Sequence, residues 1–210
     1  MIKNITAKTL IFDFDHTLFN TTAFSSSMNQ FFTDRTIPEK IYDDIIRKQR
    51  ADSKDNPDFL KLCEESEKLR YKISKEDISA FLKNDLSSYL KGPVKETLTI
   101  LKKKGYVLMI LTKGIDYYQR FKIRQSGIEK FFGKHIYVCD EKKEEALRDV
   151  AFKGVTYFID DHADEIETIL KKFPDFKIIY VKGPKTAHDR FIEHEHIPTI
   201  TDISELPKMI

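Results

Sequence analysis

The chain has 210 residues, of which 40% are hydrophobic and 33% are charged, and its 36 Lys and Arg against 34 Asp and Glu give a formal net charge of +2. This length suits one domain, or one domain with an insert. The balanced charge argues against a dedicated nucleic-acid binder, the two cysteines exclude a disulfide framework, and no apolar run reaches the roughly 20 residues of a membrane span. These features predict a soluble, cytoplasmic protein that binds neither nucleic acid nor membrane.

The first predicted element is a buried strand over residues 9–14, where a short apolar run ends in acidic residues. From residue 19 to residue 92 the pattern is helical, and no glycine occurs before Gly92. Apolar side chains at helical spacing predict one helix through Phe24 and Phe32, and three more that begin at Pro38, Pro57 and Ser74. An all-α segment is therefore expected over 19–92.

Strands and helices alternate from residue 93 onward. The predicted helices cover residues 93–104, 116–126, 141–151 and 163–172. The strands between and after them cover residues 106–111, 135–138, 155–159 and 177–181. Such alternation indicates a parallel sheet covered by helices on both faces. We therefore predict a Rossmann-like α/β core over residues 1–18 and 93–210, with the all-α segment of 19–92 inserted after the first strand.

Polar residues follow four of the predicted strands. They are Asp13 and Asp15, then Thr112, Lys113 and Gly114, then Asp140 with Lys142 and Lys143, and finally Asp160 and Asp161. Ligands of open parallel sheets bind beyond the carboxyl ends of the strands. These side chains are therefore expected to meet in one crevice.

The charges expected in this crevice favour a divalent cation and a phosphate. Asp13, Asp160 and Asp161 would repel one another strongly, and a hard cation relieves that repulsion. All-oxygen ligands suit Mg²⁺, a nearby lysine can hold a phosphate, and an aspartate is a known nucleophile for phosphoryl groups. Asp15, two residues after Asp13, is spaced to reach a leaving oxygen as a general acid. The pattern therefore favours phosphoryl transfer.

These motifs resemble those of the haloacid dehalogenase-like superfamily. Residues 13–18, DFDHTL, resemble its first motif, DxDxT, with His16 where many members have glycine. Residues 111–114, LTKG, resemble the second motif, and residues 159–161, IDD, resemble the acidic fourth motif. Lys142 lies where the lysine of the third motif is expected. The resemblance extends over residues 7–19 and 92–182.

The resemblance implies a role for each acidic residue. Asp13 would take the phosphoryl group and also bind Mg²⁺. Asp15 would protonate the leaving group and later activate water, while its backbone carbonyl binds Mg²⁺. Asp161 would be the main Mg²⁺ ligand of the fourth motif, and Asp160 would be either a second ligand or an acidic residue that supports the ligands without binding the metal.

The resemblance also implies the residues that hold the phosphate. Thr112 would donate a hydrogen bond to a phosphate oxygen, together with backbone N–H groups of Lys113 or Gly114. Lys142 would bridge the nucleophile and the phosphate. Lys143 is the alternative third-motif lysine, because it begins an apolar stripe that ends at Val150.

The function implied is that of a Mg²⁺-dependent phosphomonoester hydrolase acting on a small phosphorylated metabolite. The segment 19–92 resembles the family's C1-type cap, a lid that closes over the substrate. Dehalogenases of the superfamily lack the second aspartate of the first motif, and Asp15 is present here. A phosphomutase or phosphotransferase using the same aspartate, and a non-catalytic scaffold, are the alternatives. A receiver-type signalling module is disfavoured, because its acidic pair comes first in the chain and Asp160-Asp161 comes last.

Overall fold

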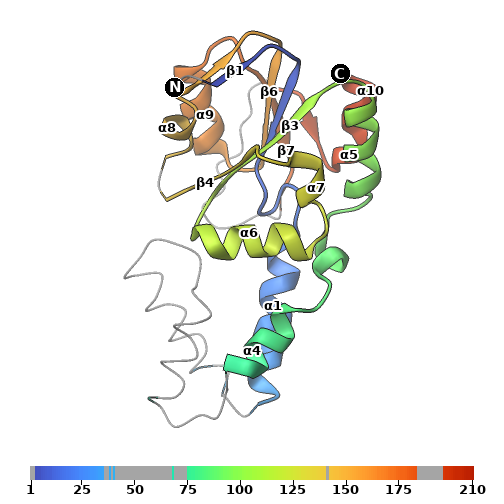
Figure 1. Cartoon of the computed structure of the whole chain (residues 1–210), viewed down its shortest axis with the longest axis vertical. Helices are drawn as coiled ribbons and strands as arrows, with labels where there is room; N and C mark the ends of the chain where they lie inside the picture. Colours follow the sequence, from blue (N-terminus) through green and yellow to red (C-terminus); the bar gives the residue numbers. More distant parts are fainter. Residues whose placement is uncertain are drawn as a thin grey trace.

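The computed structural model describes residues 3–35, 38, 40, 68, 75–140, 142–183 and 196–210. Its centre is a six-stranded sheet in the order β4-β3-β2-β6-β7-β8, and every neighbouring pair in it is parallel (Figure 1). The strands are β2 (Thr9–Phe12), β3 (Val107–Lys113), β4 (Ile136–Cys139), β6 (Thr156–Asp160), β7 (Lys177–Val181) and β8 (Thr199–Ile200). A second, two-stranded parallel sheet joins β1 (Lys3–Ile5) and β5 (Val150–Phe152).

Successive residues of the central strands enter two separate cores, because side chains alternate along a strand. In β2, Leu10 and Phe12 pack into one core and Ile11 packs into the other. The first core is covered by α5 (Val94–Lys103), α7 (Glu129–Phe132) and α10 (Leu206–Met209). The second is covered by α8 (Lys143–Ala146) and α9 (Ala163–Lys172), which lie on the opposite side of the sheet in Figure 1. The Rossmann-like α/β prediction is confirmed.

Two described α-helices come between β2 and α5 in the chain and lie beyond the carboxyl ends of the strands (Figure 1). They are α1 (Thr21–Thr33), which Asn20 caps, and α4 (Lys75–Leu82). Phe81 of α4 lies 4.7 Å from Phe31 and 6.3 Å from Phe24 of α1, measured between ring centroids. The helices predicted to begin at Pro38 and Pro57 lie outside the described residues. The assignment of 19–92 to a separate cap therefore stays a prediction.

The two connections between the sheet and these helices are bonded to each other. Phe19, in the first connection, forms an antiparallel bridge with Leu90, which follows the 3₁₀ helix η1 (Leu86–Tyr89). The Asn20 N–H donates to Tyr89 O at 2.7 Å, and the Lys91 N–H donates to Leu18 O at 3.0 Å. The chain thus leaves and re-enters the core at one place.

The structure differs from the sequence prediction in its shortest elements. The helix expected over 141–151 is only the single turn α8, because Val150, Ala151 and Phe152 pair in register with β1. Strands β1 and β8 were not predicted, and the helical segment consequently follows the second strand rather than the first. Within the described ranges, no helix is both long and apolar enough to cross a membrane.

Candidate active site

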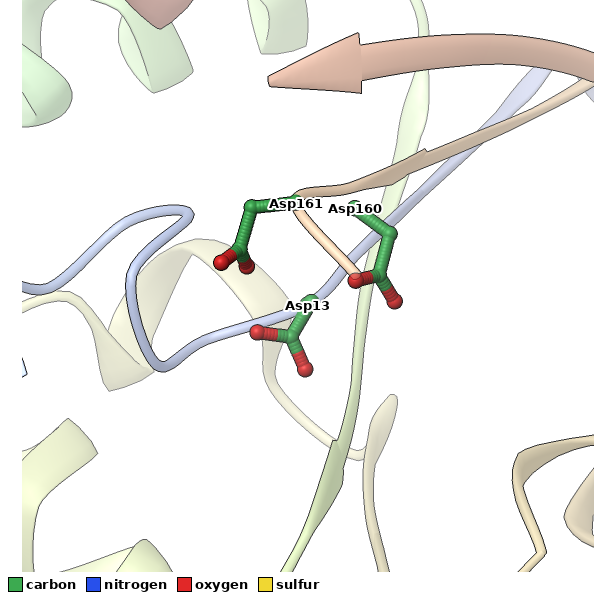
Figure 2. Close-up of side chains that lie close together, drawn as sticks. All are labelled: Asp13, Asp160 and Asp161. Carbon is green, nitrogen blue, oxygen red and sulfur yellow. The ribbon is translucent and has the colours of Figure 1, made fainter. Parts of the chain in front are cut away.

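Three carboxylates meet where β2 and β6 end (Figure 2). Phe12 and Ile159 are in register in these adjacent parallel strands, so the next residues, Asp13 and Asp160, lie side by side. The Asp13 N–H donates to Ile159 O at 2.9 Å, which fixes the backbone there. Carboxylate oxygens of Asp13, Asp160 and Asp161 all lie within 4.8 Å of one another. The predicted convergence of these three acidic residues is found.

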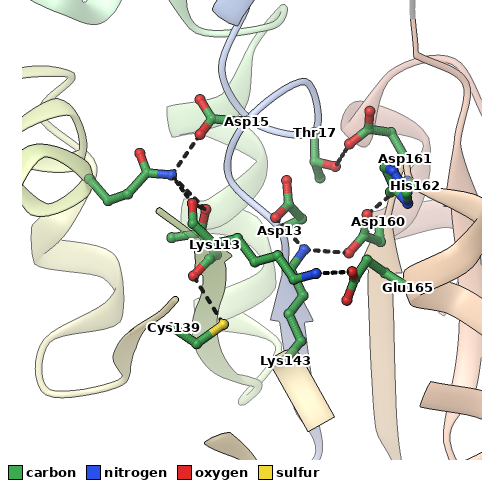
Figure 3. Close-up of polar contacts among 12 residues, drawn as sticks. Asp13, Asp15, Thr17, Lys113, Cys139, Lys143, Asp160, Asp161, His162 and Glu165 are labelled. Carbon is green, nitrogen blue, oxygen red and sulfur yellow. Dashed lines mark hydrogen bonds and ion pairs between the residues drawn. The ribbon is translucent and has the colours of Figure 1, made fainter. Parts of the chain in front are cut away.

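The lysine of this cluster is Lys143. Its Nζ lies 2.5 Å from Asp13 Oδ1 and 2.7 Å from Asp160 Oδ2, and its side chain is only 4% exposed (Figure 3). The choice of Lys142 was wrong: that side chain is 59% exposed, with its Nζ 3.8 Å from Glu145 Oε1. Lys142 has an extended backbone just before α8, whereas Lys143 is the first helical residue and is buried. The apolar stripe was the signal that pointed to Lys143.

Burial and mutual repulsion make this cluster difficult to ionise fully. Burial raises the pKa of Asp13 well above its usual range, and Asp160 and Asp161 add to the rise while Lys143 opposes it. Burial and the charge of Asp160 raise the pKa of Asp161 to about 7. Burial alone would lower the pKa of Lys143, but the carboxylates of Asp13 and Asp160 raise it. Three carboxylates against one ammonium leave an excess of negative charge.

The donor set of this cluster fits a hard divalent cation. Asp13, Asp160 and Asp161 offer only oxygen ligands, which Mg²⁺ prefers. A cation would favour the ionised forms of Asp13 and Asp161, which burial and the neighbouring carboxylates disfavour. Asp161 is oriented by Thr17, whose Oγ1 donates to Asp161 Oδ1 at 3.0 Å. That the Asp15 carbonyl also binds the metal stays a prediction.

Asp15 lies in a second polar cluster, beside α6 (Asp116–Gln125). Its Oδ1 accepts hydrogen bonds from Thr21 Oγ1 at 2.5 Å and from Lys122 Nζ at 2.6 Å. Its Oδ2 accepts from Gln119 Nε2 at 2.7 Å. Burial raises the pKa of Asp15, but the Lys122 charge and these hydrogen bonds outweigh it and hold the pKa below its usual value. Asp15 is thus held in its ionised form.

Sequence reasoning missed Gln119 and Lys122. Both are buried in α6, next to the apolar residues Tyr118 and Ile123. Their signal was a glutamine and a lysine placed, three residues apart, on the face of the helix that turns toward the core. On periodicity alone, polar residues are assigned to the solvent face.

Thr112, Lys113 and Gly114 lie at the end of β3, as predicted. Thr112 is buried and its Oγ1 accepts from Gln119 Nε2 at 3.1 Å. The Lys113 ammonium pairs with Glu165, on α9 (Figure 3). Gly114 has a left-handed φ of 132°, and its N–H donates to Cys139 O at 3.0 Å. The Gly114 amide is therefore used in a hydrogen bond between the ends of β3 and β4. The contribution of Gly114 is its backbone conformation, which allows the chain to turn.

His16 lies in the loop that carries both motif-one aspartates. Its φ of 60° is in the left-handed region, which favours glycine. A left-handed φ at this position is a physical reason for the glycine that many members of the superfamily have there in the first motif. The His16 carbonyl accepts a hydrogen bond from the Lys91 ammonium, which comes from the other connection to the helical segment. The backbone of His16 is thus held by hydrogen bonds to Phe19 and Lys91.

A sequence profile of haloacid dehalogenase-like hydrolases matches residues 10–150. A haloacid dehalogenase-like hydrolase from Burkholderia xenovorans LB400 has a similar structure, with a TM-score of 0.78 at 18% identity over 98% of this chain and 97% of that one. A HAD phosphatase from Thermococcus onnurineus gives 0.58 at 16% identity, over 96% and 97% of the chains. The L-2-haloacid dehalogenase RSc1362 gives 0.59 at 15% identity, over 98% and 99%. A search of curated proteins found no match.

Proposed function

Because the chain belongs to the haloacid dehalogenase-like hydrolase family, we propose that it is a Mg²⁺-dependent phosphomonoester hydrolase acting on a small phosphorylated metabolite. The observation that carries the proposal is the pair of separately held carboxylates on one loop. Asp13 is bonded to Lys143, and Asp15 is bonded to Thr21, Lys122 and Gln119. One carboxylate is thereby available as a nucleophile and the other for proton transfer.

In the proposed first step, Asp13 attacks the phosphorus of the ester. A new bond forms between the Asp13 carboxylate and phosphorus, and the bond from phosphorus to the alcohol oxygen breaks. Asp15 gives that oxygen a proton, which it has taken from the hydrogen-phosphate form of the bound ester, and returns to the ionised form that its lowered pKa favours. Lys143 and the buried Thr112 hold the phosphate, together with the Lys113 backbone amide.

In the proposed second step, water releases the phosphate. Asp15 takes a proton from water, whose oxygen attacks the phosphorus of the phospho-aspartate and frees inorganic phosphate and Asp13. The lowered pKa of Asp15 favours the ionised form that this step requires. Asp13, Asp160 and Asp161 would hold Mg²⁺, which when bound supplies positive charge to the phosphate oxygens. The net reaction converts a phosphate ester and water into an alcohol and phosphate.

Asp15 is also the reason to prefer a phosphatase to a dehalogenase. A halide leaves without a proton, whereas an alcohol oxygen leaves far more readily when it is protonated. A dehalogenase would therefore have no use for an acid held beside the nucleophile by three side chains. The helices α1 and α4, beyond the carboxyl ends of the strands, support a capped site for a small substrate.

The test is phosphate release from p-nitrophenyl phosphate and from a panel of nucleotides and sugar phosphates, with and without Mg²⁺. Turnover is expected to require Mg²⁺, and Asp13→Asn is expected to lower kcat at least about 10³-fold, because the nucleophile is lost. Asp175→Asn, at an exposed position, is the matched control. No turnover on the whole panel, with no Mg²⁺ binding, would refute the proposal. Transfer to a second hydroxyl without phosphate release would indicate a mutase.

A further inference from the structure

Lys122 is a buried ammonium in apolar surroundings. Its side chain is 1% exposed, and its Nζ lies 2.6 Å from Asp15 Oδ1. The same Nζ lies 5.0–5.6 Å from the ring centroids of Tyr118, Phe14 and Phe19. A buried ion pair is often no more stabilising than apolar side chains of similar volume. Apolar packing alone therefore gives no reason for a lysine here, whereas its ion pair with Asp15 and the aromatic rings around its ammonium do.

Gln119 connects Asp15 to the second motif. Its Nε2 lies 2.7 Å from Asp15 Oδ2 and 3.1 Å from Thr112 Oγ1, and it also donates to Lys113 O. With the NH₂ group turned toward these acceptors, Oε1 is buried and has no hydrogen-bond partner among the described residues. A buried acceptor without a partner is unfavourable. The amide is thus oriented for Asp15 and Thr112 at the expense of its own oxygen.

The donors define the position of the Asp15 carboxyl group. Lys122 and Thr21 hold Oδ1, and Gln119 holds Oδ2, so the group cannot rotate without losing hydrogen bonds. Each carboxylate oxygen has two acceptor sites, so Oδ2 retains one for a proton that it exchanges with substrate or water. Gln119 also sets the separation of this oxygen from Thr112, where the phosphate is proposed to bind.

We propose that Lys122 and Gln119 are positioning residues. They hold the Asp15 carboxyl group at a fixed place relative to Thr112, the proposed phosphate ligand, so that Asp15 can transfer a proton to the leaving oxygen. This inference rests on the proposed function. It predicts that substitution of Lys122 or Gln119 lowers kcat/KM most for esters whose leaving oxygen is strongly basic and must be protonated. A purely structural role would lower all turnover alike.

The experiment compares phenyl phosphate with p-nitrophenyl phosphate, which have similar shapes but differ in the basicity of the leaving oxygen. Lys122→Met is expected to lower kcat/KM for phenyl phosphate by about 100-fold, and that for p-nitrophenyl phosphate by less than about 5-fold. Gln119→Leu is also expected to lower kcat/KM for phenyl phosphate more than kcat/KM for p-nitrophenyl phosphate. Lys122→Arg keeps the charge and is expected to restore most of the phenyl phosphate activity.

Two control variants match these substitutions. Lys130→Met removes an exposed lysine whose Nζ lies 5.5 Å from the Phe131 ring centroid, and Gln125→Leu changes the last residue of α6. Both are expected to leave the ratio of the two substrates at its wild-type value. If Lys122→Met does not fold, Gln119→Leu carries the test, because removal of a neutral side chain leaves no unpaired charge.

The outcomes separate the two proposals. Equal losses on both substrates in Lys122→Met or Gln119→Leu, with wild-type turnover intact, would overturn the inference alone. If the wild type hydrolyses no phosphate ester, the proposed function fails and the inference fails with it. A leaving-group dependence that appears in Lys122→Met, and is reversed in Lys122→Arg, is the expected result.

Discussion

The described part of the molecule holds two buried lysine–aspartate clusters that differ in their charge balance. Lys143 contacts two carboxylates, Asp13 and Asp160, with Asp161 close by. Lys122 contacts one carboxylate, Asp15. The first cluster has excess negative charge, and the pKa values of Asp13 and Asp161 are raised. The second is balanced, and the pKa of its acid is lowered.

This difference in charge suits the two clusters to different roles at the same end of the sheet. A cluster with unbalanced charge gains free energy when a cation enters, so it is suited to bind something that comes and goes. A cluster with balanced charge gains little from an added ion, so it is suited to hold a group still. Strand ends supply the carboxylates of the first cluster, and α6, together with Thr21 of α1, supplies the donors of the second.

The largest expected change in stability comes from removing the lysine of the unbalanced cluster. Lys143→Met leaves Asp13 and Asp160 buried without their cation, and breaking such a pair costs about 3–5 kcal/mol of unfolding free energy. Urea denaturation at pH 7.5 without Mg²⁺ measures it. Lys142→Met is the matched control and is expected to change stability by less than about 0.5 kcal/mol. Equal effects of the two substitutions would contradict the assignment of Lys143.

The next effect is stabilisation by Mg²⁺, and it should depend on pH. The pKa of Asp161 is about 7 in the folded protein, above its ordinary value of 3.8, so the metal-free fold loses stability as the pH rises from about 4 to 7 and this carboxyl group ionises. Mg²⁺ replaces the proton, so the rise in Tm should be larger at pH 8 than at pH 6. At 100 times Kd the stabilisation is about 2.7 kcal/mol.

Two variants test where Mg²⁺ acts. Asp161→Asn is expected to abolish most of the Mg²⁺-induced rise in Tm at pH 8. Asp164→Asn changes an exposed acidic residue in the first turn of α9 and is expected to keep the full response. A Mg²⁺ response that is the same at both pH values, or unchanged in Asp161→Asn, would show that the cation binds elsewhere.

The smallest expected change in stability comes from breaking an exposed ion pair, with which the buried pairs can be compared. Arg120 Nε lies 2.8 Å from Asp116 Oδ1, and the two side chains are 41% and 61% exposed. Exposed pairs are screened by solvent, so Arg120→Met is expected to cost only about 0.5 kcal/mol, and less at high salt. Thermal denaturation at two salt concentrations measures it. A cost comparable with that of Lys143→Met would mean that burial does not distinguish these pairs.

The sequence was most informative where a polar residue that could take part in catalysis lies at the end of a strand. Asp13, Thr112 and Asp160 each follow or end an apolar run, and parallel strands bring such ends together. The lysine was misassigned by one residue, because the start of α8 decides which of two adjacent lysines is buried. Strands β1 and β8 have only three and two residues, too few to show an alternating pattern.

Gln119 and Lys122 show a different limit of sequence reasoning. Helical periodicity separates apolar from polar residues, and these two are polar residues on the buried side of α6. Their partner, Asp15, lies more than one hundred residues earlier in the chain. Only the tertiary structure could reveal that they belong to the candidate site, because neither forms a motif with its neighbours.

The position of β2 in the sheet has a consequence for how the protein folds. This strand is among the first elements in the chain, yet Thr9 pairs with Val107 on one side and with Thr156 on the other. Contacts between such distant residues form late, because closing long loops costs entropy. On the ribosome, Asp13 emerges long before Lys143 and Asp161. The candidate active site is therefore among the last parts of the molecule to be assembled, and a chain that ends before Asp161 cannot form it.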